Sequence, residues 1–221
     1  MSPRPKYTAL DDSLYDYLVS HRSPDDAVVE GLREETARLG GSAVMQVAPD
    51  QATLLRILVS AIGAKRAVEV GTFTGLSALA IARGLPSDGL LLCFDVSVEW
   101  TAIGRRYWEK AGLADRIDLR IGPAAPALRT LPEEPWLDFA FIDADKMGYP
   151  VYWDEIVRRL RPGGLVAVDN VLWEGEVVQP DKAGEDVEAI RAFNERVLAD
   201  ERVESVMLAV ADGLTLARRV G

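Results

Sequence analysis

The chain has few cysteines, histidines and basic residues, and each shortage argues against a class of protein. The single cysteine, Cys93, cannot form a disulfide within the chain, so we expect a reducing, cytoplasmic location. The single histidine, His21, has no evident catalytic partner, which argues against a serine–histidine–aspartate triad. Acidic residues outnumber basic ones by 35 to 25, the net charge is −10 and no basic stripe is present, so nucleic acid is not an expected partner.

Long apolar segments are also missing. No apolar run approaches the ~20 residues needed to span a membrane, and the N-terminal segment MSPRPKYTALDD has no apolar signal core. We therefore expect a soluble intracellular protein without a membrane partner.

A third absence concerns nucleotide binding, because the chain has no GxGxxG turn of the kind that holds a dinucleotide pyrophosphate. The turn after the first expected strand is Glu69-Val-Gly71-Thr-Phe-Thr-Gly75 instead. S-Adenosylmethionine has no phosphate; the two glycines let the backbone approach it closely, and Glu69 can accept from its ammonium group. Asp95, after the second strand, can accept from both ribose hydroxyls. The turn therefore favours S-adenosylmethionine, with an NAD(P)-dependent dehydrogenase as the alternative.

The apolar pattern predicts helices first and then an alternation of strands and helices. Three helices are expected before residue 65: over 10–19, from an N-cap at Ser23 with Pro24 in the first turn to about residue 39, and over 50–62. Buried strands are expected at 67–70, 90–94, 117–121, 137–142 and 165–168, with helices at 76–83, 98–111, after Pro123, at 151–160 and at 186–198. Two last strands, 203–209 and 214–219, are joined by the turn pair Asp212-Gly213.

This order of elements predicts an α/β fold. We expect a doubly wound, Rossmann-like, seven-stranded sheet with an antiparallel last strand, preceded by N-terminal helices. The 221 residues, 48% of them hydrophobic, fit one domain (1–221) with a sizeable core. Residues 1–64 are expected to form a helical cap or lid that starts with a mobile arm over 1–9, and residues 65–221 the α/β core.

Two expected strands end in polar residues that suit a metal site. The strand 137–142 is followed by Asp143, Ala144, Asp145 and Lys146, and the strand 165–168 by Asp169 and Asn170. Ligands of open parallel sheets gather at the carboxyl ends of the strands, so these oxygens are expected to meet and to suit Mg²⁺ or Mn²⁺. The alternative is that Asp143 and Asp145 only cap the next helix and that Lys146 only pairs with one of them.

Six blocks of sequence carry a family resemblance. They are MQVAPDQ (45–51), EVGTFTGLSAL (69–79), FDVS (94–97), FAFIDADK (139–146), GGLVAVDNVLW (163–173) and DGLTLARR (212–219). In this order they resemble the cation-dependent O-methyltransferases, which include catechol and caffeoyl-CoA O-methyltransferases, over roughly residues 40–220. The resemblance implies a class I methyltransferase fold, S-adenosylmethionine as cofactor, a divalent metal and a homodimer.

The resemblance also implies roles for individual residues. The metal ligands would be Asp143, Asp169 and Asn170, and Lys146 would be the catalytic base. The cofactor would be bound by Val47, Glu69, Gly71, Thr72, Ser77, Asp95, Ala124 and Asp143. Position 47 is often threonine in plant relatives, and Val47 cannot make the hydrogen bond of that hydroxyl.

The residues and the resemblance together predict an S-adenosylmethionine-dependent O-methyltransferase that needs Mg²⁺, with Mn²⁺ or Ca²⁺ as alternatives. The acceptor is expected to present two neighbouring oxygens, as a catechol or an antibiotic or polyketide intermediate does. An α-hydroxy acid such as a hydroxymalonyl thioester on a carrier protein is an alternative acceptor. The segment between Trp173 and Asp186 is expected to shape this choice. A non-catalytic binding module is the other rival, but it leaves a lysine beside three oxygen ligands unexplained.

Aromatic residues have two interpretations at this stage. One set forms either a pocket wall or part of the core: Tyr149, Tyr152, Trp153 and Trp173. A second set supplies candidate anchors for a dimer: Trp100, Trp108, Trp136 and Trp173.

Overall fold

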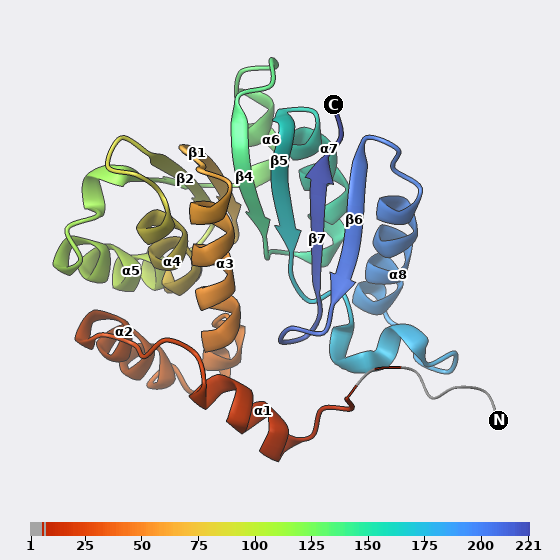
Figure 1. Ribbon diagram of the computed structural model, residues 1–221, viewed down its shortest axis with the longest axis horizontal. Helices are drawn as coiled ribbons and strands as arrows, with labels where there is room; N and C mark the ends of the chain where they lie inside the picture. Colours follow the sequence, from red (N-terminus) through yellow and green to blue (C-terminus); the bar gives the residue numbers. More distant parts are fainter. Residues whose placement is uncertain (1–5, 7) are drawn as a thin grey trace.

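A seven-stranded sheet forms the centre of the molecule (Figure 1). In the computed structural model, which describes residue 6 and residues 8–221, the strands pair in the order β3-β2-β1-β4-β5-β7-β6. They are β1 (Arg66–Val70), β2 (Leu90–Asp95), β3 (Ile117–Ile121), β4 (Leu137–Ile142), β5 (Leu160–Val168), β6 (Val203–Leu208) and β7 (Leu214–Arg219). The pairs among β1 to β5 are parallel, and β7 is antiparallel to both β5 and β6. The predicted α/β fold with an antiparallel last strand is confirmed.

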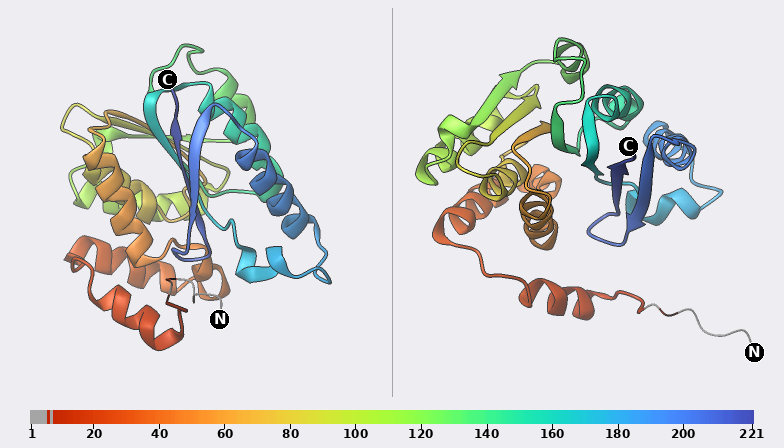
Figure 2. Two further views of the ribbon diagram at one scale, coloured as in Figure 1. Left: turned by 45° about the vertical axis from the view of Figure 1, so that its right-hand side comes forward. Right: turned by 45° about the horizontal axis from the view of Figure 1, so that its top comes forward.

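Helices cover both faces of this sheet (Figures 1 and 2). One face packs against α3 (Pro49–Ala61), α4 (Leu76–Gly84) and α5 (Val98–Lys110), and the other against α6 (Ala124–Arg129), α7 (Tyr149–Val157) and α8 (Glu185–Leu198). In β4, Phe139 and Phe141 belong to one buried cluster, whereas Ala140 and Ile142 belong to the other. Successive side chains of a strand point to opposite faces, so a strand between two helical layers needs an unbroken apolar run.

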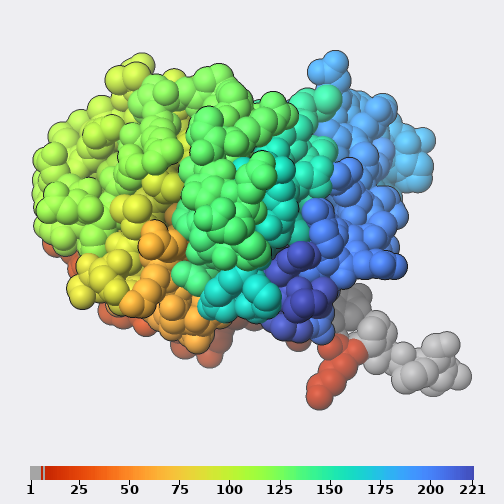
Figure 3. Space-filling view, turned by 90° about the horizontal axis from the view of Figure 1, so that it is seen from above, coloured from red at the N-terminus to blue at the C-terminus, as the bar shows by residue number. Residues whose placement is uncertain are grey.

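Two N-terminal helices, α1 (Asp12–Ser20) and α2 (Ala27–Ala37), lie below the sheet in Figure 1, at the end toward which β4 and β5 point. The 3-10 helix η1 (Gly40–Met45) connects α2 to α3. Figure 3 shows the opposite end of the molecule, where the red N-terminal residues appear only at the rim. The division into cap and core at residue 64 stays a prediction, and the arm expected over residues 1–9 lies mostly outside the described residues. Among the described helices, none is long and apolar enough to cross a membrane.

The start of α2 differs from the sequence prediction. The sequence favours Ser23 as N-cap with Pro24 in the first turn, whereas the first helical residue is Ala27 and the cap is Asp26. The Asp26 carboxylate accepts from the backbone N–H groups of the second and third helical residues, at 3.1 and 3.0 Å. Asp25 is engaged elsewhere by two arginine side chains, which leaves Asp26 to cap the helix.

The boundary between α7 and β5 is also a correction. The sequence predicts a helix over 151–160, whereas α7 ends at Val157 and Leu160 already belongs to β5. Leu160 pairs with Leu137 of β4, and the Arg159 carbonyl accepts from the Leu137 N–H at 3.0 Å. This early strand pairing depends on a distant segment, so local periodicity does not reveal it.

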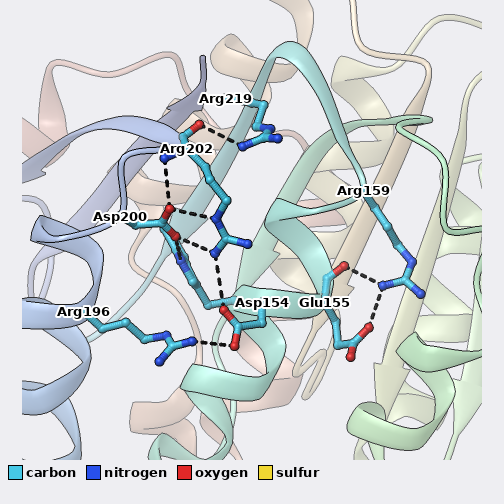
Figure 4. Close-up of polar contacts among 8 residues, drawn as sticks. Asp154, Glu155, Arg159, Arg196, Asp200, Arg202 and Arg219 are labelled. Atoms are coloured by element: carbon cyan, nitrogen blue, oxygen red, sulfur yellow. Dashed lines mark hydrogen bonds and ion pairs between the residues drawn. The ribbon is translucent and has the colours of Figure 1, made fainter. Parts of the chain in front are cut away.

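A charged cluster near the C-terminus ties three elements together (Figure 4). Asp200 Oδ2 accepts from Trp153 Nε1 of α7 at 2.8 Å and from Arg202 Nη2 at 2.6 Å, and its Oδ1 accepts from Arg202 Nε at 2.8 Å. These bonds, chiefly those from Arg202, lower the pKa of Asp200 well below its usual range. Arg219 Nη1 of β7 donates to the Arg202 carbonyl at 3.2 Å. Asp200 therefore links α7 to Arg202, which directly precedes β6 and in turn contacts β7.

Replacing Asp200 with alanine is expected to lower the free energy of unfolding by about 1–3 kcal/mol, because the buried Trp153 N–H loses its acceptor. Denaturant unfolding followed by tryptophan fluorescence measures this change. Glu204→Ala is the matched control, since the ion pair of Glu204 with Arg218 is exposed and such pairs contribute roughly 0–1 kcal/mol. Equal losses in the two variants would contradict the role given to Asp200.

Candidate active site

The loops that leave β1, β4 and β5 begin side by side. Gly71 N donates to the Phe94 carbonyl at 2.9 Å, Asp143 N to the Val70 carbonyl at 2.8 Å, and Asp169 N to the Ile142 carbonyl at 3.0 Å. These bonds extend the sheet ladder past the strands, so the ends of β1, β2, β4 and β5 form one edge above α1 and α2 in Figure 1.

The residues singled out from the sequence lie at this edge or in elements that border it. Val47 precedes α3, Glu69 is in β1, Gly71 and Thr72 follow β1, Ser77 is in the first turn of α4, Asp95 ends β2, Ala124 opens α6, Asp143 follows β4, Lys146 opens the 3-10 helix η3 (Lys146–Gly148), and Asp169 and Asn170 follow β5. The structure thus brings them to one end of the sheet. Their roles as ligands stay predictions.

Gly71 is required by a close approach between two loops. Its φ is +86°, and a Cβ at this position would lie 1.7 Å from the backbone oxygen of Asp143. A larger residue would push apart the glycine-rich turn and the loop that carries the acidic residues. Asp95 shapes the other side of the turn: Oδ2 accepts from Thr72 N and Phe73 N at 2.8 Å each. The carboxylate expected to meet a ribose therefore also fixes the conformation of the turn.

Glu69 is a fully buried carboxylic acid in β1. Its Oε2 accepts from Cys93 Sγ at 3.4 Å, while its Oε1 and the Thr72 hydroxyl lack hydrogen-bond partners among the described residues. Burial raises the pKa of Glu69 from 4.5 to about 7. Burying a charge without a partner is costly. An ammonium group bound here would supply the hydrogen-bond donor and the positive charge that the described residues do not. This supports the expected contact with the methionine part of the cofactor.

Lys146 connects the polar residues at two strand ends. Its Nζ donates to Asn170 Oδ1 at 2.7 Å and lies 3.5 Å from Asp143 Oδ1. It also donates to the Tyr149 hydroxyl at 2.7 Å, and that hydroxyl donates to the Asp169 carbonyl at 3.0 Å. The lysine is 8% exposed. These five residues form one connected cluster, not a surface ion pair.

The acidic residues of this cluster fit a hard cation. Burial first, and then the charge of Asp143, raise the pKa of Asp169 to about 7. Burial also raises the pKa of Asp143. Two carboxylates and an amide oxygen are donors that Mg²⁺ and Ca²⁺ prefer, and a cation would relieve their repulsion. No group of three His, Cys, Asp or Glu side chains suited to a metal occurs among the described residues, so such a site depends on Asn170 as third ligand.

Most of the aromatic residues near the cluster belong to the core. Three of the four aromatic residues considered for a pocket wall are buried: Tyr149, Tyr152 and Trp153. Trp173 alone of that set is only partly buried, and Lys146 Nζ lies 5.7 Å from its ring centroid. Trp108, considered as a dimer anchor, is 2% exposed and donates through Nε1 to the Gly75 carbonyl at 3.0 Å. Trp108 is therefore a core residue and cannot anchor a dimer.

The family model described as O-methyltransferase matches residues 19–220. The chain belongs to the O-methyltransferase family. Caffeoyl-CoA O-methyltransferase 2 of Zea mays is 40% identical over 95% of this chain and 83% of its own length. The structure of an O-methyltransferase from Bacillus cereus in complex with SAH has 33% identity and a TM-score of 0.84, covering 94% of this chain and 97% of the other. The O-methyltransferase TomG from Streptomyces achromogenes, involved in tomaymycin synthesis and solved with SAM, has 29% identity and a TM-score of 0.84, with 95% and 96% covered.

This O-methyltransferase is an S-adenosylmethionine-dependent enzyme. The family, the enzyme class and the organic cofactor predicted from the sequence are confirmed. The two rival interpretations, an NAD(P)-dependent dehydrogenase and a non-catalytic binding module, are wrong.

A largely buried polar cluster, not predicted from the sequence, joins α2 to the glycine-rich turn. Gln46 Nε2 donates to Thr36 Oγ1 at 2.8 Å and to Thr74 Oγ1 at 3.2 Å, and the two threonine hydroxyls are 2.8 Å apart. Thr36 is in α2 and Thr74 is in the glycine-rich turn. Gln46 and Thr74 both fall within the blocks that carry the family resemblance. That position was the signal in the sequence that could have pointed to them.

Asp212, predicted only as a turn residue between the two last strands, also contacts the proposed metal site. Its Oδ2 accepts from Asn170 Nδ2 at 3.5 Å, and its Oδ1 accepts from Glu174 N at 2.7 Å. The Asn170 amide thus has its nitrogen toward Asp212 and its oxygen toward Lys146. This orientation places Asn170 Oδ1 on the side of the acidic residues, and an oxygen ligand is what a hard cation requires.

Proposed function

We propose that this enzyme requires a divalent cation and methylates one hydroxyl of an acceptor that presents two neighbouring oxygens. The observation that carries the proposal is the cluster of Asp143, Asp169 and Asn170 around Lys146 where β4 and β5 end. Mg²⁺ is the expected cation, with Mn²⁺ or Ca²⁺ as alternatives. A cation held by these three residues would lower the pKa of the acceptor hydroxyl and orient it.

Lys146 is the general base in this proposal. Its Nζ is held at 2.7 Å from both Asn170 Oδ1 and the Tyr149 hydroxyl, so it is fixed beside the proposed ligands. It takes the proton of the acceptor hydroxyl, and the acceptor oxygen then bonds to the methyl carbon of S-adenosylmethionine as the carbon–sulfur bond breaks. Holding the two reactants in line contributes up to roughly 7–11 kcal/mol to such a reaction.

The cofactor is proposed to lie along the ends of β1 and β2. Glu69 would bind the ammonium group, Asp95 the ribose hydroxyls, and the Gly71 backbone would allow the close approach. Five further residues would complete the site, as the family resemblance implies: Val47, Thr72, Ser77, Ala124 and Asp143.

The proposed acceptor class rests on two grounds, which are the requirement for two neighbouring oxygens and the names of similar proteins. The Zea mays relative is named for caffeoyl-CoA and the Streptomyces neighbour for tomaymycin synthesis. We therefore propose a catechol-like molecule or an antibiotic intermediate. An α-hydroxy acid tethered to a carrier protein stays the alternative, because it presents two oxygens in the same way.

A homodimer is also proposed. Apolar side chains exposed on the N-terminal helices and α3 support a contact surface, with Tyr17 58%, Leu18 47% and Ile57 56% exposed. The cytoplasmic location and the lack of nucleic-acid and membrane partners stay predictions from the sequence.

Treatment of the wild-type enzyme with EDTA tests the proposed metal. We expect the treated enzyme to bind S-adenosylmethionine in calorimetry but to methylate none of a panel of catechols until Mg²⁺ is added, because the cation acts on the acceptor. Full activity in excess EDTA would contradict the metal. Equal rates with monohydroxy analogues of the same acceptors would contradict the two-oxygen requirement.

A further inference from the structure

Several backbone carbonyls of the segment between Asn170 and α8 accept hydrogen bonds from one side chain, that of Arg191. We name residues 173–182 the acceptor loop; it contains the 3-10 helix η4 (Trp173–Val178) and the residues that follow. Arg191, in α8, donates to four of its backbone carbonyls. Nε binds the carbonyl of Val177 at 3.0 Å, Nη1 that of Lys182 at 3.0 Å, and Nη2 those of Glu176 at 2.8 Å and Gln179 at 2.6 Å.

The acceptor loop is only partly packed, since Trp173 and Val177 lie partly buried against the core. No residue of η4 is buried. Trp173, Glu174 and Gly175 have successive φ values of 48°, 53° and 77°, and a left-handed conformation costs roughly 1–2 kcal/mol for each residue other than glycine. A strained segment without a buried residue keeps one conformation only when other contacts help to hold it. Four hydrogen bonds from a charged guanidinium are contacts of that kind.

The same face of α8 also holds the start of the segment. Asn194, one turn after Arg191, donates through Nδ2 to the Val171 carbonyl at 2.9 Å, next to the proposed ligand Asn170. Two residues further along, Trp173 has its ring centroid 5.7 Å from Lys146 Nζ. The path of the acceptor loop therefore determines what lies beside the proposed base.

We propose that Arg191 is a positioning residue for the acceptor, acting by holding the acceptor loop and with it Trp173 beside Lys146. The inference rests on the proposed function, since it takes the acceptor to bind at Lys146. The hydrogen bonds of Arg191 go to none of the residues assigned to the cofactor or the metal. Its removal is therefore expected to change acceptor binding and to leave cofactor binding intact.

Arg191→Met tests this role, because methionine keeps an aliphatic stem and removes the donors. We expect the protease Lys-C to cleave after Lys182 about tenfold faster, and the KM for the acceptor to rise about tenfold. The kcat and the S-adenosylmethionine affinity are expected to change less than about threefold. Arg191→Lys, which lacks the planar fork, is expected to lie between wild type and Arg191→Met. Arg196→Met is the matched control on the same helix, since Arg196 pairs with Asp154 in the charged cluster of Figure 4.

Acceptor KM is measured with the catechol that the wild-type enzyme methylates best. Unchanged cleavage with unchanged KM would overturn the inference, and so would faster cleavage with unchanged KM, because the loop would then not govern acceptor binding. A rise in S-adenosylmethionine Kd equal to that in KM would also overturn it, since that indicates general damage. A wild-type enzyme that methylates no catechol would contradict the proposed function instead, and cleavage after Lys182 would then decide whether Arg191 holds the loop.

Discussion

Replacing Asp169 with alanine is expected to reduce methyl transfer at least ~1000-fold, which is roughly 4 kcal/mol of transition-state stabilisation. Without this buried carboxylate the proposed cation site keeps only Asp143 and the amide of Asn170. The S-adenosylmethionine affinity is expected to stay within about threefold of wild type, because the cofactor is proposed to bind along β1 and β2. Calorimetry with the cofactor and release of S-adenosylhomocysteine measure the two effects separately.

Asp145→Asn is the matched control for that experiment. Asp145 lies in the same loop as Asp143, is exposed, and accepts from the Tyr152 hydroxyl at 2.6 Å. This substitution removes one negative charge near the site without removing a proposed ligand. We expect activity within about tenfold of wild type and an unchanged requirement for Mg²⁺. Asp169→Ala at wild-type rates would exclude Asp169 as a ligand, and equal losses in both variants would indicate that net charge, not ligation, determines the rate.

Lys146→Ala is expected to slow the reaction 10²–10⁴-fold near neutral pH, the usual range for loss of a general base. Its residual rate is expected to rise with pH, because hydroxide in the solvent replaces the missing base. The cofactor affinity is expected to stay near that of wild type. Rates measured at saturating cofactor between pH 6 and pH 9 test this dependence.

Lys146→Arg separates proton transfer from charge. Arginine keeps a positive charge and hydrogen-bond donors close to Asp143 and Asn170, but it stays protonated in proteins and cannot accept the proton. We therefore expect it to be about as slow as Lys146→Ala. A Lys146→Arg enzyme with the wild-type rate would leave Lys146 only the role of neutralising the acidic cluster.

Most strands were predictable because each corresponds to a short apolar run in the sequence. β3, β4 and β7 begin and end at the residues that the apolar pattern indicated. Apolar residues occupy most of the buried positions of these strands, and polar or turn residues mark their ends. Once β4 and β5 are neighbours in a parallel sheet, their ends meet, so Asp143 and Asp169 had to come to one edge.

The remaining features depend on contacts between distant segments. Ser23, Asp25 and Asp26 are all suitable helix caps. Asp26 caps the helix because Arg22 and Arg33 bind the Asp25 carboxylate. Lys146 fits a surface ion pair equally well in the sequence, and only its burial among residues of two strand ends distinguishes the site. The individual cofactor and metal assignments came from family resemblance, which compares whole blocks and not single local patterns.

Arg191 binds the acceptor loop through main-chain oxygens alone. Every amino acid, proline included, supplies a carbonyl, so this anchor does not depend on which side chains the loop carries. Exposed positions such as Val178 and Gln179 can change in size and polarity while the four bonds persist, provided that the backbone path is kept. The loop is thereby free to diversify in evolution, and libraries randomised at such positions can select new acceptors without rebuilding the sheet or the cofactor turn.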